Sequence, residues 1–226
     1  MCEMRQETDY AVHHVQKVLA FFVAMRRFAD QLTQQGHQII YYRLDDPLNR
    51  QDLIQNIEQL IKSGPYEAFG YQQPDEYRLD VQLQEWCARQ LITIEQEDTQ
   101  HFLTTRTDWS THFKDKKTYT MEFFYRAMRK KTGYLMTPTG QPEGGIWNFD
   151  GENRKSWNGN PAIPEGPIFQ PEIEQILSMI KDHGVKTMGH PPQLGRFLWA
   201  TSRSEALLLL YHFVTHLLPN FGRYQD

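Results

Sequence analysis

The amino-acid sequence predicts the α/β class of folds. Over roughly the first hundred residues, short β-rich segments alternate with segments whose apolar residues recur at helical spacing. The connections between these segments are short, which favours parallel strand pairing through crossover helices. From Thr99 onward the alternation stops. We therefore expect a Rossmann-like, doubly wound parallel sheet of about four strands, followed by a linker and helices.

The first expected element is a long helix over 10–34, because its apolar residues form one stripe along a helical surface. The β-rich segment HQIIYYRL, 37–44, predicts a strand. Asn49 predicts the N-cap of a helix that runs to about Lys62. The alternation continues with a buried strand at 67–71, a helix opened by residues 73–75, and a strand at 91–95.

The second part of the chain has a different pattern. Residues 118–133, TYTMEFFYRAMRKKTG, predict a helix that ends at Gly133 with cations in its last turn. The segment QPEGGIWNFDGENRK, 141–155, has no regular period yet carries several large side chains, which indicates a loop that packs in place. Prolines between 161 and 171 mark an extended connector. Two further helices are expected at 171–182 and 202–218, the last opened by a capping box of Ser202 and Glu205.

Composition excludes several classes of function. The net charge of −4 argues against a generally basic nucleic-acid coat, although not against a local basic patch. Cys2 and Cys87 are too few for a disulfide framework or a four-thiolate metal site, so we predict no metal ligands and a reducing, cytoplasmic setting. The sequence has no apolar run long enough to span a membrane and no signal peptide. It also lacks P-loop, G-x-S-x-G and H-E-x-x-H motifs, and we predict no catalytic residue.

Five blocks of the sequence resemble the photolyase-related proteins of bacteria, in the iron–sulfur branch of the cryptochrome/photolyase superfamily. The blocks keep the same order over nearly all of the chain: HHVQKVLAFFVAMRRFADQL, YYRLDDP, QPDEYRLD, MEFFYRAMRKKTGYLM and PEGGIWNFDGENRK. The resemblance implies the N-terminal portion of such a flavoprotein. It implies an α/β antenna-type domain at 1–135, then an interdomain linker and helices at 136–226 that lead to an absent C-terminal flavin domain.

The resemblance also implies what the complete protein would bind. FAD, a [4Fe–4S] cluster and the main contacts to damaged DNA are expected in the absent domain, so this chain alone is not expected to act as a DNA lyase. By position, Glu7 matches an acidic residue that contacts a ribityllumazine antenna pigment, and Met4 and Tyr10 are candidate neighbours. A carboxylate can accept hydrogen bonds from ring N–H or ribityl hydroxyl groups. The alternative interpretation of Glu7 is an acid that favours a helix start.

The two ends of the sequence look cut. Residues 1–4 leave almost no room for a strand before the first helix, so the first strand of the sheet and its loop are expected to be missing. We therefore expect weak or absent binding of the antenna pigment. Unpaired strand edges, together with the apolar face of the helix at 202–218, predict that the isolated chain self-associates.

Other candidate sites have plainer interpretations. His13 and His14 would point about 100° apart on a helix and could not chelate one metal together. The basic residues of the helical segment 126–131, together with Arg154 and Lys155, could contact phosphate. The favoured interpretation is that they form ion pairs within the chain, with Glu122, Glu143 and Glu152. The five tryptophans are interpreted as core and linker anchors, not as an electron-transfer chain: Trp86, Trp109, Trp147, Trp157 and Trp199.

The function that these observations favour is the antenna-binding and docking portion of a photolyase-related flavoprotein. Its complete form would act in light-driven repair of (6-4) lesions in DNA or in blue-light sensing. A stand-alone α/β interaction module without photochemistry is the alternative from another class. A small nucleotide-binding enzyme is a third interpretation, and it rests on fold analogy alone.

Overall fold

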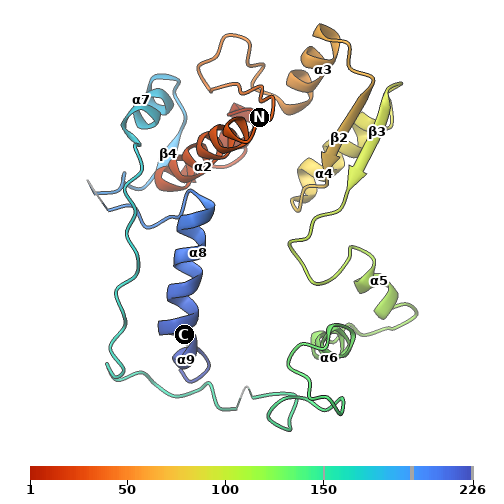
Figure 1. Ribbon diagram of the computed structural model, residues 1–226, viewed down its shortest axis with the longest axis vertical. Helices are drawn as coiled ribbons and strands as arrows, with labels where there is room; N and C mark the ends of the chain where they lie inside the picture. Colours follow the sequence, from red (N-terminus) through yellow and green to blue (C-terminus); the bar gives the residue numbers. More distant parts are fainter. Residues whose placement is uncertain (150, 194–195, 225–226) are drawn as a thin grey trace. The chain divides into compact units, whose positions relative to one another are not determined.

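The computed structural model describes residues 1–149, 151–193 and 196–224 (Figure 1). The chain divides into two compact units. One comprises Met1–Pro65 together with Ser156–Asp226, and the other is Tyr66–Lys155. They are called the terminal unit and the middle unit below. The limits of these units do not coincide with the domain boundary near residue 135 that the sequence predicts. That boundary stays a prediction.

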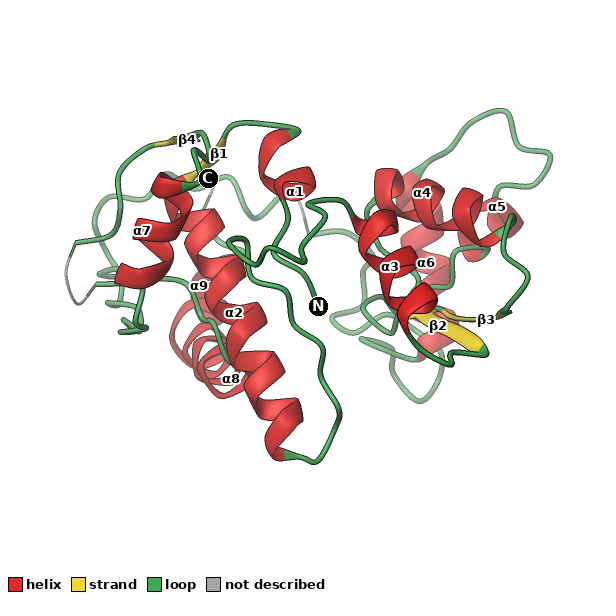
Figure 2. Cartoon of the chain, turned by 90° about the horizontal axis from the view of Figure 1, so that it is seen from above, coloured by secondary structure: helices red, strands yellow, loops and turns green. Residues whose placement is uncertain are grey.

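The fold belongs to the α/β class, as predicted, with helices and short parallel strands (Figure 2). The strands of the described residues form two separate pairs: β1 (His13–His14) with β4 (Thr187–Met188), and β2 (Ala68–Gln72) with β3 (Thr93–Glu97). Both pairs are parallel. The parallel direction is therefore confirmed, but the expected sheet of about four strands is wrong for the described residues.

The strand expected at 37–44 is reduced to a single bridge. Tyr42 pairs in parallel with Cys2, and the Glu3 amide donates to the Tyr42 carbonyl at 2.9 Å. The Tyr42 amide donates in turn to the Met1 carbonyl at 2.9 Å. A ladder extends only as far as its partner does, and the partner here is the short segment 1–3. The first residues thus pair with 40–42 despite their short length.

The terminal unit contains most of the helices. It holds α1 (Arg5–Asp9), α2 (Val15–Gln34), α3 (Leu53–Ser63), α7 (Glu174–Asp182), α8 (Arg203–His212), a π-helix (Phe213–Leu217) and α9 (Leu218–Phe221). Its core lies where α2 packs against α7. The apolar stripe predicted on the first helix supplies Val15, Val18, Leu19, Phe22 and Val23 to this core, and α7 supplies Ile176, Met179 and Ile180.

The helix predicted at 10–34 begins at Val15 instead. His13 and His14 form β1 and pair with residues 187 and 188, which holds them in extended backbone. The His14 ring then accepts a hydrogen bond from the Gln16 amide at 3.2 Å and caps α2. Successive strand residues point to opposite faces, so these two rings diverge here as well, although for a reason other than the predicted one.

Asn49 is not the N-cap of α3, contrary to the prediction. Asp52 caps that helix by accepting a hydrogen bond from the Gln55 amide at 2.8 Å. Asn49 is buried, and its side-chain amide donates to the carbonyls of Glu3 and Arg43 at 2.5 and 2.9 Å. Both residue types favour caps, and tertiary contacts with the first residues of the chain decide between them.

A buried ion pair links three segments of the terminal unit. The side chain of Glu3 has no exposed surface, and its two carboxylate oxygens accept from Nε and Nη2 of Arg26, on α2, at 2.6 and 3.0 Å. The Tyr41 hydroxyl and the Leu44 amide donate to the same carboxylate at 2.8 and 3.0 Å. Burial and the neighbouring Glu3 charge raise the pKa of Tyr41. Although burial alone would lower it, the contact with Glu3 raises the pKa of Arg26.

The middle unit is built around the pair of β2 and β3, with α4 (Tyr77–Cys87) between them in the sequence. Strand β2 was expected to be buried, but its residues alternate between exposed and half-buried. One face is covered by α4, whose Trp86 is 1% exposed and lies 5.2 Å from the Phe69 ring. The residues of the other face, Ala68, Gly70 and Gln72, are exposed, so the burial prediction is wrong for them.

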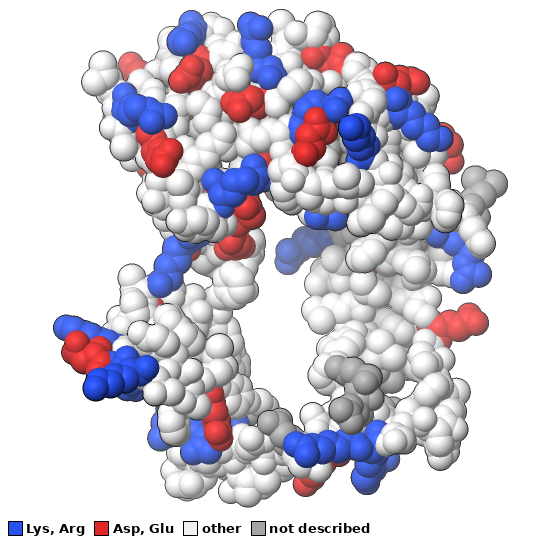
Figure 3. Space-filling model, turned by 180° about the vertical axis from the view of Figure 1, so that it is seen from behind, with Lys and Arg blue, Asp and Glu red and all other residues white. Residues whose placement is uncertain are grey.

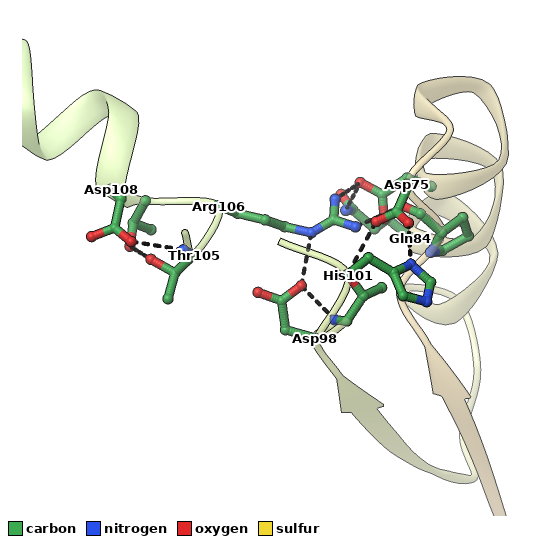
Figure 4. Close-up of polar contacts among 11 residues, drawn as sticks. Asp75, Gln84, Asp98, His101, Thr105, Arg106 and Asp108 are labelled. Atoms are coloured by element: carbon green, nitrogen blue, oxygen red, sulfur yellow. Dashed lines mark hydrogen bonds and ion pairs between the residues drawn. The ribbon is translucent and has the colours of Figure 1, made fainter. Parts of the chain in front are cut away.

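Polar contacts fix the loop after β3 (Figure 4). Arg106 contacts the carboxylates of Asp80 and Asp98 at 3.1 and 3.3 Å and donates to the Pro74 carbonyl at 2.6 Å. His101 lies 2.6 Å from Asp75, and this hydrogen bond lowers the pKa of Asp75. The loop leads to α5 (Asp108–His112), whose Trp109 packs on Phe124 of α6 (Met121–Thr132).

The predicted helix at 118–133 is confirmed as α6, and Gly133 ends it in the left-handed conformation at φ 76°. The helices expected at 171–182 and 202–218 begin at Glu174 and Arg203. Ser202 accepts from the Glu205 amide at 3.2 Å, as predicted, but Glu205 accepts from the Thr201 amide rather than from that of Ser202. The last helix continues through the π-helical turn to Phe221.

The tryptophans are only partly core anchors. Trp86 is a core residue, but Trp199 is 53% exposed, so the core interpretation is wrong for it. None of the helices in the described parts of the chain is long and apolar enough to cross a membrane.

We predict that Arg26→Met destabilises the protein by about 3 kcal/mol, because Glu3 would remain buried without its cationic partner. Chemical denaturation of the wild type and the variant measures this difference. The matched control is Lys62→Met, which removes a largely exposed partner of Glu58 and should cost less than about 0.5 kcal/mol. Equal costs for the two variants would contradict the structural role of the buried pair.

We predict that Glu205 makes the unfolding free energy of the protein depend on pH. Burial would raise the pKa of its carboxyl group, but hydrogen bonds from Thr201 and from the Arg27 guanidinium, 2.8 Å away, lower this pKa below its usual range. Its contribution is therefore fully present above the unfolded-state pKa and is lost as pH falls through the lower folded-state pKa. The difference in unfolding free energy between wild type and Glu205→Gln, about 1 kcal/mol at pH 7, should shrink toward zero in acid. As a control, Glu85→Gln changes an exposed carboxylate and should alter the unfolding free energy at pH 7 by less than about 0.5 kcal/mol.

Candidate functional site

A cavity of about 180 Å³ lies in the terminal unit, where the first residues, α1, β1 and α2 meet. Small-molecule sites more often have volumes of about 300–1,000 Å³, so this cavity has room for part of a ligand of that kind. We call it the Glu7 cavity. Its lining residues are Cys2, Glu7, Thr8, Tyr10, His13, Lys17, Val18, Phe21, Phe22 and Met25.

Glu7 lies on α1 and is half-buried, and its Oε1 atom is shielded from solvent. Tyr10 follows α1 and is 56% exposed, with its ring 4.9 Å from that of His13 in an edge-to-face arrangement. The structure thus brings Glu7 and Tyr10 to one cavity. Met4 is buried at 6% exposure and does not line it.

Several lining residues were not singled out in the sequence. Lys17, Phe21 and Met25 come from α2, and their spacing of four residues places them along one side of that helix. The signal that could have found them is Phe21, an aromatic residue outside the buried stripe, with a lysine four residues before it. Lys17 Nζ lies 5.9 Å from the centre of the Phe21 ring.

The cavity combines polar groups with an apolar wall. Lys17 Nζ lies 3.2 Å from the His13 ring nitrogen Nδ1, and Glu7 supplies a carboxylate. Burial raises the pKa of the Cys2 thiol, against the opposing effect of the N-terminal charge, so this thiol is not activated as a nucleophile. The arrangement suits a flat ring with polar edges: Phe21 and Phe22 can cover the ring, while Glu7 and Lys17 supply an acceptor and a donor.

Metal binding finds no support in the described residues, which contain no group of three or more histidine, cysteine, aspartate or glutamate side chains placed to hold an ion. Cys2 and Cys87 are both free thiols. A cluster that requires four thiolates does not fit these residues.

The basic region is partly neutralised within the middle unit. Arg126 pairs with Glu122, as predicted, and Lys131 pairs with Asp108 at 2.6 Å. The lysine contact also lowers the pKa of Asp108. Acidic and basic side chains are interspersed on the face of the molecule that Figure 3 draws, which fits the mild net charge.

The fold and the Glu7 cavity define an α/β protein with a small, partly polar pocket beside its first residues. Residues 1–195 match the family described as deoxyribodipyrimidine photo-lyase-related protein. This match covers most of the chain, and the chain belongs to that family.

A named relative extends the comparison to the whole chain. The chain is 31% identical over 228 aligned residues to a (6-4) photolyase of Agrobacterium fabrum (strain C58 / ATCC 33970). The alignment covers 100% of this chain but 44% of the relative, so the chain spans less than half of that protein's length.

Proposed function

We propose that this chain is the antenna-binding and docking portion of a photolyase-related flavoprotein that acts in light-driven DNA repair or in blue-light sensing. Family membership supports a role of this kind, and the observation that carries it is the similarity to a (6-4) photolyase along the full chain. In the complete protein the substrate would be DNA with a (6-4) lesion. The portion that this chain represents would position an antenna pigment and support the catalytic part.

The Glu7 cavity is the proposed pigment site. A ribityllumazine has a flat ring with N–H and carbonyl edges and a chain of hydroxyl groups. Glu7 would accept a hydrogen bond from the ring or the ribityl chain, Lys17 would donate one, and Phe21 with Phe22 would cover part of the ring. The cavity is smaller than the pigment, so much of a bound pigment would stay exposed and its affinity should be low.

FAD would supply the light-driven electron, and a [4Fe–4S] cluster is expected in the same complete protein. The two free cysteines do not fit the cluster, and the Glu7 cavity is too small for a dinucleotide. Both groups are therefore proposed for a part of the complete protein outside this chain.

Titration of the purified 226-residue chain with ribityllumazine, followed by pigment fluorescence, tests the proposed site. We expect weak binding in the wild type and about tenfold weaker binding for Glu7→Ala, because a polar group of the pigment would lose its acceptor. Asp9→Ala is the matched control, since it removes the same charge from the same helix but lies outside the cavity lining. Tight binding that Glu7→Ala leaves unchanged would show that the pigment binds elsewhere.

The docking role rests on α8 and the turn that follows it. These elements carry consecutive exposed apolar side chains, with Leu208 at 53% and Leu210 at 56% exposure. A helix that is apolar all round is normally buried. Since more than half of the (6-4) photolyase relative lies outside the matched region, we propose that the corresponding part of a complete protein covers this face. A stand-alone interaction module would use the same face for another partner.

In the isolated chain the exposed face should cause self-association, because burying apolar surface contributes about 25 cal/mol per Å². Light scattering at micromolar concentration should detect a dimer or larger species. The double variant Leu208→Lys/Leu210→Lys should restore the monomer. The control Gln34→Lys/Gln35→Lys adds the same charge at the exposed end of α2 and should leave association unchanged. A wild-type chain that is monomeric throughout would contradict this prediction.

A further inference from the structure

A second and larger cavity, of about 670 Å³, lies in the middle unit between α6 and the segment 135–149. We call it the α6 cavity. It shares no residue with the Glu7 cavity. Its lining residues are Met121, Glu122, Tyr125, Arg129, Leu135, Glu143, Gly144, Trp147, Asn148 and Phe149.

Three cations of α6 lie around one indole ring, that of Trp147, which lines this cavity together with Arg129. The charged groups of Arg126, Arg129 and Lys130 lie 5.3, 5.2 and 5.6 Å from the centre of the Trp147 ring. An arginine that contacts a ring through its face keeps its N–H edges available for an anion. Trp147 therefore holds these cations in place without neutralising them.

The carboxylates near these cations do not neutralise all of their positive charge. Glu122 and Glu143 line the cavity, and Arg129 is the cation among the lining residues. Arg126 and Lys130 lie beside the Trp147 ring, and Glu122 pairs with Arg126, so around this ring three cations stand against two carboxylates. Arg129 is only 7% exposed and donates to the carbonyl of Leu135. Its Nε atom is buried and has no hydrogen-bond partner among the described residues. The Nε atom of Arg126 is likewise buried and has no hydrogen-bond partner among the described residues.

A buried cationic donor without an acceptor is costly in a folded protein. A ligand that brings anionic oxygens into the cavity would satisfy such donors. Arg129 lines the cavity, and Lys130, which is exposed beside the Trp147 ring at the edge of the lining, is the second cation placed to receive it. Arg126 already has a carboxylate partner, and Lys131 is paired with Asp108.

The cavity also presents exposed aromatic rings. Tyr125 and Phe149 line it and are 44% and 45% exposed. The Phe149 ring lies against Gly144, where an added Cβ atom would be 2.7 Å from the ring, and Gly144 has φ +76°. The turn therefore requires glycine at 144 to keep Phe149 beside the cavity.

We propose that the α6 cavity binds a nucleoside 5′-phosphate, with its phosphate on Arg129 and Lys130 and its base on the exposed rings of Phe149 and Tyr125. Guanidinium and ammonium groups beside exposed aromatic rings match the two halves of such a ligand. Inorganic phosphate would leave the rings unused and most of the volume empty. Glu143 can accept hydrogen bonds from ribose hydroxyl or base N–H groups.

Calorimetric titration of the purified chain with AMP, adenosine and inorganic phosphate tests this site. AMP should bind at least about tenfold more tightly than adenosine, since the phosphate makes charge-assisted hydrogen bonds. It should also exceed inorganic phosphate by about tenfold through base stacking. Binding of AMP no tighter than that of inorganic phosphate would overturn the proposal.

Variants locate the binding. Lys130→Ala and Phe149→Ala change exposed side chains and should each weaken AMP binding by about fivefold or more. Lys117→Ala, which removes an exposed lysine that is neither in the cavity lining nor among the cations beside Trp147, should leave binding unchanged. Unaltered binding in both Lys130→Ala and Phe149→Ala, or equal weakening in the control, would contradict the site. Arg129→Lys retains the charge but loses the planar fork, and it should also weaken AMP binding.

A 5′-phosphorylated hexa-deoxyadenylate distinguishes the source of the nucleotide. Tighter binding of this oligonucleotide than of AMP, lost in Phe149→Ala, would assign the cavity to a nucleotide of single-stranded DNA. Tighter binding of AMP would assign it to a free nucleotide. The proposed ribityllumazine site is the Glu7 cavity, which shares no residue with the α6 cavity. The pigment proposal and the nucleotide proposal can therefore fail independently.

Discussion

The carboxylate of Glu3 is the interaction on which the terminal unit depends. It is fully buried, and it accepts hydrogen bonds from Arg26 on α2 and from Tyr41 and Leu44 in the extended segment that follows. The backbone of the same residue pairs with Tyr42, and its carbonyl accepts from buried Asn49. One residue near the N-terminus thus determines where α2, the segment 40–44 and the approach to α3 lie. Such a charge is tolerated in the interior only because each carboxylate oxygen has partners.

The Glu7 cavity follows from this arrangement. With Glu3 fixed against α2, the chain turns at once into α1, and Glu7 and Tyr10 are brought beside the surface of α2 that carries Lys17 and Phe21. Arg26 also contacts the Met179 sulfur at 3.3 Å, which connects the ion pair to α7 and the apolar core. The polar network and the core therefore stabilise one another, and the cavity lies at their edge.

The middle unit uses a different means to fix segments without regular structure. Arg106 holds the loop after β3 through two carboxylates and a carbonyl, while Trp147 holds the segment after α6 through three cations. In both cases a planar group gathers several partners, which fixes the backbone without a ladder of hydrogen bonds. The second arrangement leaves cationic edges and exposed rings at one cavity. Binding chemistry can therefore arise from contacts whose first effect is structural.

The sequence by itself determined the α/β class, the helix at Met121–Thr132 with its stop at Gly133, and the family, because these depend on local spacing, on glycine at positive φ and on long specific blocks. Tertiary structure decided the rest. His13 and His14 lie outside the helix in which they were predicted, because they pair as a strand with a segment more than 170 residues away. Asn49 became a buried contact rather than a cap, and Met4 entered the interior while Glu7 reached the cavity. Local patterns identify which backbone states are favourable, but strand partners, burial of a carboxylate and the walls of a cavity come from distant segments that no local pattern specifies.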